Sequence, residues 1–459
     1  MGNSNVSRPK IIIIGGGFGG LYATQALKRA PVDVTLIDRH NYHLFQPLMY
    51  QVATGSLSPG EIAAPLRGIL SKQKNTRVLL GDVVDIDPDA RKVVLADGAV
   101  FDYDFLVVAA GSQTSYYGHD DWSHLAPSLK TVEEATAIRR KVLFAFEAAE
   151  RVSDPEERSA WLTFAIVGAG ATGVELAGAL SEIARQTLKN DFRSIQSKDA
   201  RIILIDGADR ILPTMPADLG QKADQALVKL GVTIRTGVMV TEIDRGGLTL
   251  KTKEATQHLS SKTVIWAGGV QASQLAATLA ARLKTEPDKS GRIKVTDRLN
   301  PPGYSNIFII GDLALSYGVN GKPLPGLAQV AMQGGSYAAY AILKKTRGND
   351  RIRSFKYFDK GDLAVIGRGR AVADIFGVHL WGFPAWLIWL FVHLMYLVEF
   401  QTRMVVFVQW AFQYFTFSRG ARLITGVGSS ELAEELSCDK SAERDSDAIK
   451  SQAATPAHL

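Results

Sequence analysis

The chain has 459 residues and 46% apolar residues, enough for two or three domains with large cores. With 52 Lys and Arg against 46 Asp and Glu, the net charge is only +6, which argues against a nucleic-acid partner and leaves a membrane surface open. The single cysteine, Cys438, excludes an internal disulfide, a dithiol redox pair and a cysteine-rich metal site, and we expect no metal.

The first element is a glycine fingerprint, G-G-G-F-G-G, over residues 15–20. It follows an apolar run, Ile11 to Ile14, that predicts a buried parallel strand, and it precedes an expected helix from Leu21 to Arg29. A second strand then ends in Asp38, 23 positions after Gly15, close to the spacing of an acid that binds a ribose. This pattern predicts a dinucleotide site at the start of the helix.

A second fingerprint, G-A-G-A-T-G, occupies residues 168–173 after the apolar run 164–167. The next strand, 201–205, ends in Asp206, which lies 38 positions after Gly168, so its role as a ribose acid is less secure than that of Asp38. Two fingerprints in strand–turn–helix context predict two dinucleotide sites. A chain with two such sites is expected to move electrons between two cofactors.

Three further segments define the domain organisation. Strands 105–108 and 263–266 close on Gly111 and Gly268, with a helix at 131–151 between the two units, and a last strand, 307–310, leads into Gly311-Asp312. Because that last strand comes after the second unit is complete, we expect an α/β fold with one Rossmann-like domain inserted into another. The predicted boundaries are 1–115 and 276–345 for the first domain, 116–275 for the second, and 346–425 for a helical C-terminal region.

The two sites are expected to differ in their cofactors. The aromatic, amide and proline segment over residues 41–48 is long enough to cover a flavin ring. Beside the second fingerprint, Glu175 and Asp206 are poor neighbours for a 2′-phosphate, which favours NADH over NADPH.

These motifs resemble the type II NADH:quinone oxidoreductases, single-subunit NADH dehydrogenases that do not pump protons and belong to the pyridine nucleotide-disulfide oxidoreductase-like flavoproteins. The resemblance covers roughly residues 9–425. It depends on the run Y-H-L-F-Q-P-L-M-Y-Q-V-A-T-G at 42–55, on G-V-E at 173–175, on Gly311-Asp312 and on A-Q-V-A-M-Q at 328–333.

The resemblance implies a role for each matched residue. On the FAD side it assigns Gly15, Gly17, Gly20, Asp38 and Asp312. On the NADH side it assigns Gly168, Gly170, Gly173, Glu175 and Asp206, with Glu175 near the nicotinamide and the flavin. Gly111 and Gly268, on which two strands close, are further expected cofactor-binding residues. Gln329 and Gln333 match the quinone motif and share one helix face, and Lys360 matches a lysine near the quinone end. Glu175 or Lys360 is expected to relay protons.

Each of these residues also has a plainer interpretation. The two glutamines could lie on a solvated helix face, Glu175 could be a solvated first-turn acid, and Lys360 could be an ordinary loop lysine. His43 and His393 are interpreted as packed residues, and neither receives a role.

The apolar C-terminal region indicates contact with something apolar. From Val378 to Phe400 the only charged residue is Glu399, and four of the seven tryptophans fall between 381 and 410. The 23-residue segment could span a bilayer, but Pro384 and internal tryptophans favour monotopic attachment. A second segment, Met404 to Phe417, suits an interfacial helix, with Gln409 and Gln413 on one face.

These inferences place the protein at the cytoplasmic face of a bacterial inner membrane, as a peripheral or monotopic enzyme and a homodimer, with a disordered tail at 426–459. Two rival functions stay open. One is a soluble NAD(P)H-dependent flavoprotein reductase with a protein or small-molecule acceptor, and the other is a flavoprotein sensor that binds NADH with negligible turnover.

Overall fold

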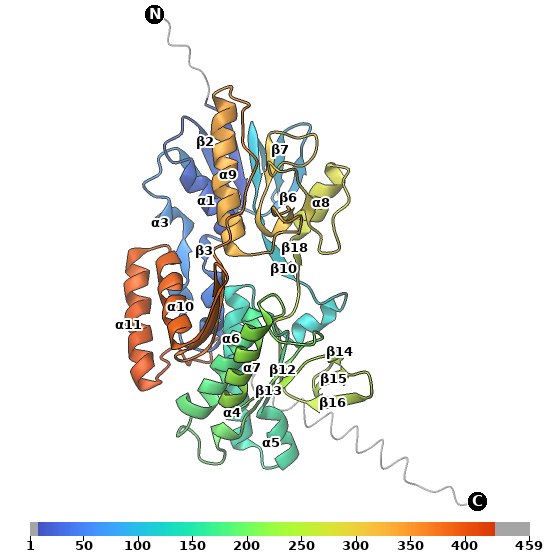
Figure 1. The fold of residues 1–459 in the computed structure, drawn as a ribbon, viewed down its shortest axis with the longest axis vertical. Helices are drawn as coiled ribbons and strands as arrows, with labels where there is room; N and C mark the ends of the chain where they lie inside the picture. The colour runs from blue at the N-terminus through green and yellow to red at the C-terminus, as the bar shows by residue number, and fades with distance from the viewer. Residues whose placement is uncertain (1–7, 427–459) are drawn as a thin grey trace, which may run out of the picture.

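A five-stranded parallel sheet forms the first lobe of the computed structural model, which describes residues 8–426 (Figure 1). Its strands lie in the order β20-β9-β1-β2-β5, with bounds Ile307–Ile309, Phe105–Val108, Lys10–Ile14, Asp33–Asp38 and Thr76–Leu80. The four isoleucines of β1 are almost wholly buried, as expected for a central parallel strand covered on both faces.

A four-stranded parallel sheet repeats this arrangement in the second lobe. Its order is β13-β12-β11-β17, with bounds Val232–Arg235, Arg201–Ile205, Thr163–Val167 and Thr263–Trp266. This order corresponds strand for strand to β5-β2-β1-β9 of the first sheet. Because β20 pairs with β9 only after the second sheet is complete, the predicted insertion of one Rossmann-like unit into another is confirmed.

Each lobe also carries a three-stranded antiparallel meander that the sequence analysis did not predict. The two meanders occupy equivalent places in the chain: one directly precedes β9, and the other directly precedes β17, the equivalent strand of the second sheet. They are β6-β7-β8 (Val83–Asp87, Lys92–Leu95, Val100–Asp102) and β14-β15-β16 (Met239–Ile243, Gly247–Lys251, Thr256–Ser260).

Helix α1 (Phe18–Ala26) packs closely against α9 (Ala328–Thr346). A Cβ on Gly335 of α9 would lie 2.1 Å from the carbonyl oxygen of Gly19. The expected bounds of the first helix, Leu21 to Arg29, were wrong by three residues at each end. The reason is that the last glycines of the fingerprint already form the first turn of α1.

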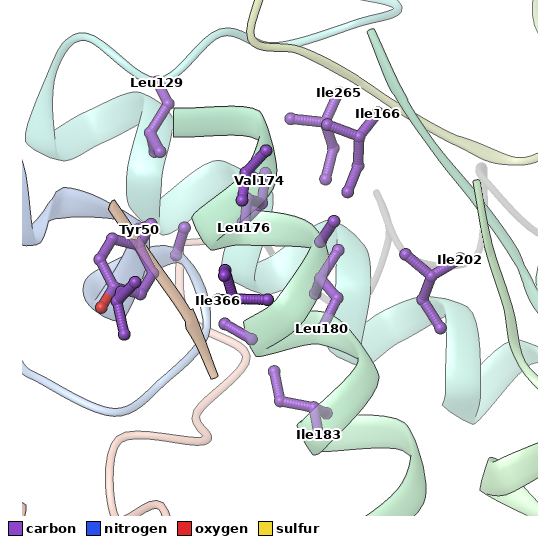
Figure 2. Packing of buried hydrophobic residues seen from close by; sticks show 14 of the residues in the cluster. Tyr50, Leu129, Ile166, Val174, Leu176, Leu180, Ile183, Ile202, Ile265 and Ile366 are labelled. Carbon is purple, nitrogen blue, oxygen red and sulfur yellow. The ribbon is translucent and has the colours of Figure 1, made fainter. Parts of the chain in front are cut away.

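Helix α6 (Ala171–Glu182) forms the centre of the largest buried cluster. Figure 2 shows its side chains between Ile166, Ile202 and Ile265 of the second sheet on one side and Tyr50 and Ile366 on the other. The predicted inward residues are all buried: Val174, Leu176, Ala177 and Leu180. The helix is therefore covered on two sides.

The remaining helices pack around the two lobes. Helix α4, expected at 131–151, begins after Thr131, whose hydroxyl accepts a hydrogen bond from the Glu134 N–H at 3.1 Å as an N-cap. Helix α4 spans Val132–Arg151. The other helices around the two lobes are α2 (Met49–Ala53), α3 (Leu66–Ile69), α5 (Pro155–Trp161), α7 (Ala217–Leu230) and α8 (Gln274–Arg282).

The C-terminal region consists of an antiparallel sheet, β22-β23-β24 (Asp362–Gly367, Arg370–Ile375, Val378–Gly382), followed by helices α10 (Phe383–Tyr396) and α11 (Phe400–Thr416). The interpretation of residues 378–400 as one segment was wrong, because its first five residues form β24. Gly382, with a φ of +72°, and Pro384 then start α10. Within residues 8–426, no helix is both long and apolar enough to cross a membrane.

Helix α11 has the reverse polarity of an ordinary surface helix. Gln413 donates a hydrogen bond inward to the Ser56 carbonyl at 2.5 Å, and Gln409 donates to Glu61 at 2.5 Å. Large apolar side chains of both helices point outward instead, and we call this set the apolar outer face: Phe383, Leu387, Phe391, Met395, Phe400, Met404, Phe407, Val408, Phe412 and Phe415. Figure 1 shows α10 and α11 next to each other along one side of the molecule.

The predicted tail at 426–459 lies, from residue 427 onward, outside the described residues, as does Cys438.

Gly178→Ala is expected to destabilise the fold. A Cβ at this position of α6 would lie 1.7 Å from the Ile366 carbonyl oxygen on β22, so the helix and the sheet must separate. We expect the free energy of unfolding to fall by about 1–3 kcal/mol, measured by chemical denaturation. Gly60→Ala is the matched control, since its Cβ meets no atom within 4 Å. An unchanged Gly178→Ala variant would contradict this contact.

Candidate active site

The first fingerprint connects β1 to α1 through three glycines with different surroundings. Gly15 has a φ of +97°, and a Cβ there would lie 2.3 Å from the Ala109 carbonyl oxygen. A Cβ on Gly20 would lie 1.8 Å from the Gly15 carbonyl oxygen, whereas a Cβ on Gly17 would meet no atom within 4 Å. Gly15 and Gly20 therefore serve the turn and the helix–strand contact, while Gly17 leaves the helix N-terminus accessible to a pyrophosphate.

The second fingerprint has the same geometry at the start of α6. Gly168 has a φ of +107°, and a Cβ there would lie 2.5 Å from the backbone nitrogen of Gly268. A Cβ on Gly173 would lie 1.8 Å from the Gly168 carbonyl oxygen, and one on Gly170 would meet nothing within 4 Å. The two cradles are equivalent residue by residue.

The two strand-terminal acids also occupy equivalent positions. Asp38 accepts hydrogen bonds from the Gly16 N–H and, at 2.6 Å, from the His40 N–H. Asp206 accepts from the Ala169 N–H and, at 2.7 Å, from the Ala208 N–H. The longer interval before Asp206 is taken up by a π-helical turn, Ile183–Thr187, and a 3₁₀ turn, Ser197–Asp199. The long spacing between Gly168 and Asp206 is thus explained by these two extra turns and does not argue against Asp206 as the ribose acid.

Asp312 contacts Ser112, the residue after Gly111, where a short strand pair links the two lobes. Gly111 has a φ of +68° and precedes β10 (Ser112–Thr114), which pairs with β18 (Val270–Ala272). The Ser112 hydroxyl donates to the Asp312 carboxylate at 2.5 Å, and the Lys130 ammonium donates to the Ser112 hydroxyl at 2.9 Å. Burial lowers the pKa of Lys130, and the charges of Asp312 and Glu134 oppose this.

The aromatic segment at 41–48 covers the first fingerprint. It contains β3 (Tyr42–Leu44) and a 3₁₀ turn, Gln46–Leu48, that leads into α2. The rings of His43 and Phe45 lie edge-on to Phe18, with centroids 5.1 and 5.8 Å away. His43 is buried, its Nδ1 lies 2.9 Å from the Gly16 carbonyl oxygen, and burial lowers its pKa. Its surroundings are those of a packed residue.

Gln329 and Gln333 share one face of α9, but in this structure both bind backbone. Gln329 donates to the Gly361 carbonyl at 3.1 Å and accepts from the Lys360 N–H at 3.2 Å. Gln333 donates to the Phe358 carbonyl at 2.8 Å and accepts from the Phe358 N–H at 2.9 Å. The pair thus holds residues 358–361 against α9, and each amide keeps one further N–H for a ligand.

Lys360 lies at this same junction. Its ammonium donates to the Tyr396 hydroxyl of α10 at 2.9 Å, so the segment contacts both α9 and the C-terminal helices. Gln329 and Gln333 therefore do not lie on a solvated helix face, because both amides bind the backbone of residues 358–361.

Glu175 is a buried acid one turn into α6, with only 9% of its surface exposed. The Val365 N–H of β22 donates to its Oε1 at 3.4 Å. Burial raises the pKa of Glu175 to about 8, and the Val365 hydrogen bond opposes this shift. Burial thus favours the protonated carboxyl at neutral pH, and the low exposure of this side chain contradicts its interpretation as a solvated acid.

Glu175 lies in the wall of a cavity between α6, β22 and the C-terminal helices, which we call the tryptophan pocket. It encloses about 750 Å³, including the part open to solvent. The residues that line it include Tyr50, Gln51, Glu175, Glu182, Arg368, Trp386, Trp389, Trp410, Tyr414 and Arg419. The structure does not bring Gln329 or Gln333 into this pocket. The two glutamines contact Phe358 and Gly361, just before β22, whereas Glu175 contacts Val365 in the middle of β22.

The sequence analysis missed several of these residues. Ser112 and Lys130 stand in a turn and before a helix, with no local signal of a shared cluster. Trp389 and Trp410 were noted only as apolar residues that meet something outside the protein, yet both are buried. A partial signal was the clustering of four tryptophans within 30 residues.

Comparison with known proteins identifies the class. The family model described as pyridine nucleotide-disulphide oxidoreductase matches residues 9–335, and the NDH2 C-terminal domain matches residues 360–419. The chain belongs to the pyridine nucleotide-disulphide oxidoreductases.

Within this class the chain belongs to the type II NADH:quinone oxidoreductases, as its motifs predicted. It is 48% identical over 424 residues to the type II NADH:quinone oxidoreductase Ndh of Mycobacterium tuberculosis, covering 91% of this chain and 90% of the relative. NdhA of the same organism is 45% identical, covering 91% and 90%. The solved NDH2 of Plasmodium falciparum has the same fold, with a TM-score of 0.83 at 22% identity over 91% of this chain and 100% of that chain.

The buried carboxyl of Glu175 is expected to make stability depend on pH. Because its pKa is about 8 in the folded protein and 4.5 as a free side chain, the unfolded chain releases this proton first as pH rises. Glu175 thus lowers the free energy of unfolding between pH 4.5 and 8, by up to about 1.4 kcal/mol per pH unit, and has no further effect above that range.

Glu175→Gln should flatten this slope between pH 5 and 8, as measured by denaturant titrations at each pH. Glu147→Gln is the control, because Glu147 is exposed on helix α4. Equal slopes for the wild type and Glu175→Gln would show that Glu175 is ionised in the folded protein.

Proposed function

We propose that this chain oxidises NADH and reduces a quinone by way of a bound FAD. When bound, FAD accepts a hydride from NADH and passes two electrons to the quinone. The observation that carries the proposal is the pair of equivalent dinucleotide cradles in one chain, at the N-termini of α1 and α6. The names of the two mycobacterial relatives support the same activity.

The first cradle is assigned to FAD and the second to NADH. The FAD residues are Gly15, Gly17, Gly20, Asp38, Gly111 and Asp312, and the NADH residues are Gly168, Gly170, Gly173, Glu175, Asp206 and Gly268. The corresponding domains are residues 1–115 and 276–345 for FAD and 116–275 for NADH. The geometry fits these groups, because the open positions at Gly17 and Gly170 let a pyrophosphate reach the backbone N–H groups.

The chain's own residues have distinct tasks in this proposal. Asp38 and Asp206 orient the two ribose groups, and Asp312 is held in place by Ser112 and Lys130. A quinone becomes a quinol by gaining two electrons and two protons. The hydride of NADH accounts for both electrons and one proton, so one further proton is needed, and we assign its delivery to the protonated carboxyl of Glu175. Gln329 and Gln333 hold the segment 358–361 before β22, and we assign the remaining N–H groups of these glutamines and of Lys360 to binding the quinone.

The apolar outer face is assigned to the membrane. Its side chains lie on the solvent side of α10 and α11 at about four-residue intervals, while the glutamines of α11 face the protein. Such a surface matches a peripheral or monotopic enzyme, and we place it at the cytoplasmic face of a bacterial inner membrane, as a homodimer.

The direct test follows the flavin colour of the purified protein. NADH should bleach it and ubiquinone-1 should restore it. Gln329→Ala and Gln333→Ala should slow the second step while FAD stays bound. A flavin that remains reduced in the presence of quinone would overturn the proposal, and a soluble electron carrier that reoxidises it instead would favour a reductase with a protein acceptor.

Gly17→Ala and Gly170→Ala should separate the two cradles. Neither Cβ meets the protein, so the apoprotein of each variant should keep the melting temperature of the wild-type apoprotein. Gly17→Ala should lose FAD on purification, whereas Gly170→Ala should keep FAD and raise the KM for NADH about tenfold, since a methyl group displaces the pyrophosphate. FAD loss from Gly170→Ala alone would reverse the assignment of the two sites.

A double variant, Phe391→Glu with Phe412→Glu, should release the protein from lipid vesicles. These two side chains are 63% and 60% exposed on α10 and α11, and charges there oppose insertion between lipids. Vesicle sedimentation should show most of the variant in the supernatant, with NADH oxidation by ubiquinone-1 retained in detergent. Val319→Glu, at a 92% exposed residue away from these helices, is the control and should sediment with the vesicles.

A further inference from the structure

Tyr117 is an exposed aromatic residue in a backbone conformation that side chains rarely adopt. The His119 N–H donates to the Tyr116 carbonyl at 3.1 Å and closes a tight turn. Its two central residues, Tyr117 and Gly118, have φ of +54° and +93°, as in a type I′ turn. Glycine, asparagine and aspartate normally occupy these positions, because a bulky side chain meets a steric penalty there. A tyrosine is therefore unfavourable for the turn itself.

Burial gives the Tyr117 side chain little to offset this cost. The residue is 72% exposed, and its hydroxyl has no hydrogen-bond partner within residues 8–426. The preceding Tyr116, by contrast, is buried and donates from its hydroxyl to the Ala126 carbonyl at 2.9 Å. The protein core thus explains Tyr116 but not Tyr117. An exposed side chain on a strained backbone is typical of a ligand contact.

The Tyr117 ring lies at the edge of the second cradle. A Cβ on Gly269 would lie 2.6 Å from the Tyr117 hydroxyl oxygen. The residue before it, Gly268, lies against the fingerprint, because a Cβ on Gly168 would lie 2.5 Å from its backbone nitrogen. Strand β17 is thus followed by Ala267, Gly268 and Gly269, a stretch almost without side chains that contacts both the fingerprint and the Tyr117 ring.

Trp266 helps to fix the orientation of this ring. The ring centres of Tyr117 and Trp266 are 6.4 Å apart, edge to face. The Trp266 Nε1–H donates to the Ser115 carbonyl at 3.0 Å, so the indole is tied to the segment that carries Tyr117. Just before this segment, β10 pairs with β18 between the two lobes (Figure 1). The ring is therefore held in place before a ligand binds, which lowers the entropy lost on binding.

The strand order of the second sheet indicates which half of a dinucleotide lies near Tyr117. Asp206, the expected ribose acid, follows β12, which lies on one side of β11. Strand β17 lies on the other side of β11, and the fingerprint follows β11 itself. With its pyrophosphate at the fingerprint and its adenosine ribose at Asp206, NADH extends its other half across the end of β17. That half is the nicotinamide and its ribose.

We propose that the Tyr117 ring packs against the nicotinamide–ribose half of NADH and is a binding residue for the reducing end of this substrate. The inference rests on the proposed function and adds a residue outside both fingerprints. The exposed ring offers a flat apolar face beside a stretch that leaves room for a ligand, and contacts between such rings are favourable. The unfavourable turn residue is thus retained for the ligand.

The test replaces Tyr117 by asparagine, a residue that the turn itself prefers. In the FAD-loaded protein, Tyr117→Asn should weaken NAD⁺ binding in calorimetry, and raise the KM for NADH, by roughly 3- to 10-fold. Its affinity for ADP, which lacks the nicotinamide and its ribose, should match that of the wild type. Tyr117→Phe keeps the ring and should bind NAD⁺ as the wild type does.

Phe376→Asn is the matched control, because Phe376 occupies the same kind of turn in the C-terminal sheet. Phe376 is 68% exposed with a φ of +52°, and it precedes Gly377, with a φ of +80°, in the connection from β23 to β24. Both asparagine variants relieve an unfavourable turn residue, so neither should melt below the FAD-loaded wild type. Only Tyr117→Asn should lose NAD⁺ affinity.

Unchanged NAD⁺ affinity in Tyr117→Asn would overturn the inference, and so would an equal loss of ADP affinity, which would place the ring at the adenosine half. A Tyr117→Phe variant as weak as Tyr117→Asn would exclude the ring contact. A melting temperature of Tyr117→Asn well below that of Phe376→Asn would show that Tyr117 serves the fold instead. Failure of NADH to bleach the wild-type flavin would refute the proposed function, whatever the variants do.

Discussion

The rest of the structure depends on close backbone contacts of helix α6. At its start, Gly173 lies against the Gly168 carbonyl and fixes the turn of the second cradle. One turn beyond Glu175, Gly178 lies against the Ile366 carbonyl and fixes the C-terminal sheet. Larger side chains at either glycine would separate these layers. The contacts place the second nucleotide cradle and the buried acid on one rigid element, next to the strand that also forms the pocket wall.

The polarity of the C-terminal helix α11 is reversed relative to an ordinary surface helix. The amide N–H groups of Gln409 and Gln413 find acceptors in Glu61 and the Ser56 carbonyl, so these side chains can face inward. The phenylalanines and aliphatic residues of the same helix are left outside, where water is a poor solvent for them. The inward glutamines and outward apolar residues leave a large exposed apolar surface on these helices, next to the tryptophan-lined pocket. Both features fit an enzyme that takes an apolar substrate from a lipid surface.

The candidate site was only partly predictable from the sequence. Glycine roles at both fingerprints follow from local backbone geometry, because a positive φ and a helix start within six residues need no distant partner. Asp38 and Asp206 were predictable for the same reason, since each ends the next strand. The burial of Glu175 was not predictable, because it depends on β22, where Val365 contacts it from 190 residues away. The tryptophan pocket likewise combines five separate segments, 50–56, 175–187, 365–368, 386–389 and 410–419.

The sequence by itself determined the class of protein, the two nucleotide cradles and the return of residues 307–309 to the first sheet. These features depend on apolar runs and glycine spacings that act over short distances. Only the tertiary structure decided that Glu175 holds a proton, that Gln329 and Gln333 bind the segment 358–361, and that Trp389 faces inward. Desolvation and hydrogen-bond pairing depend on which distant segments meet, and no local pattern encodes that.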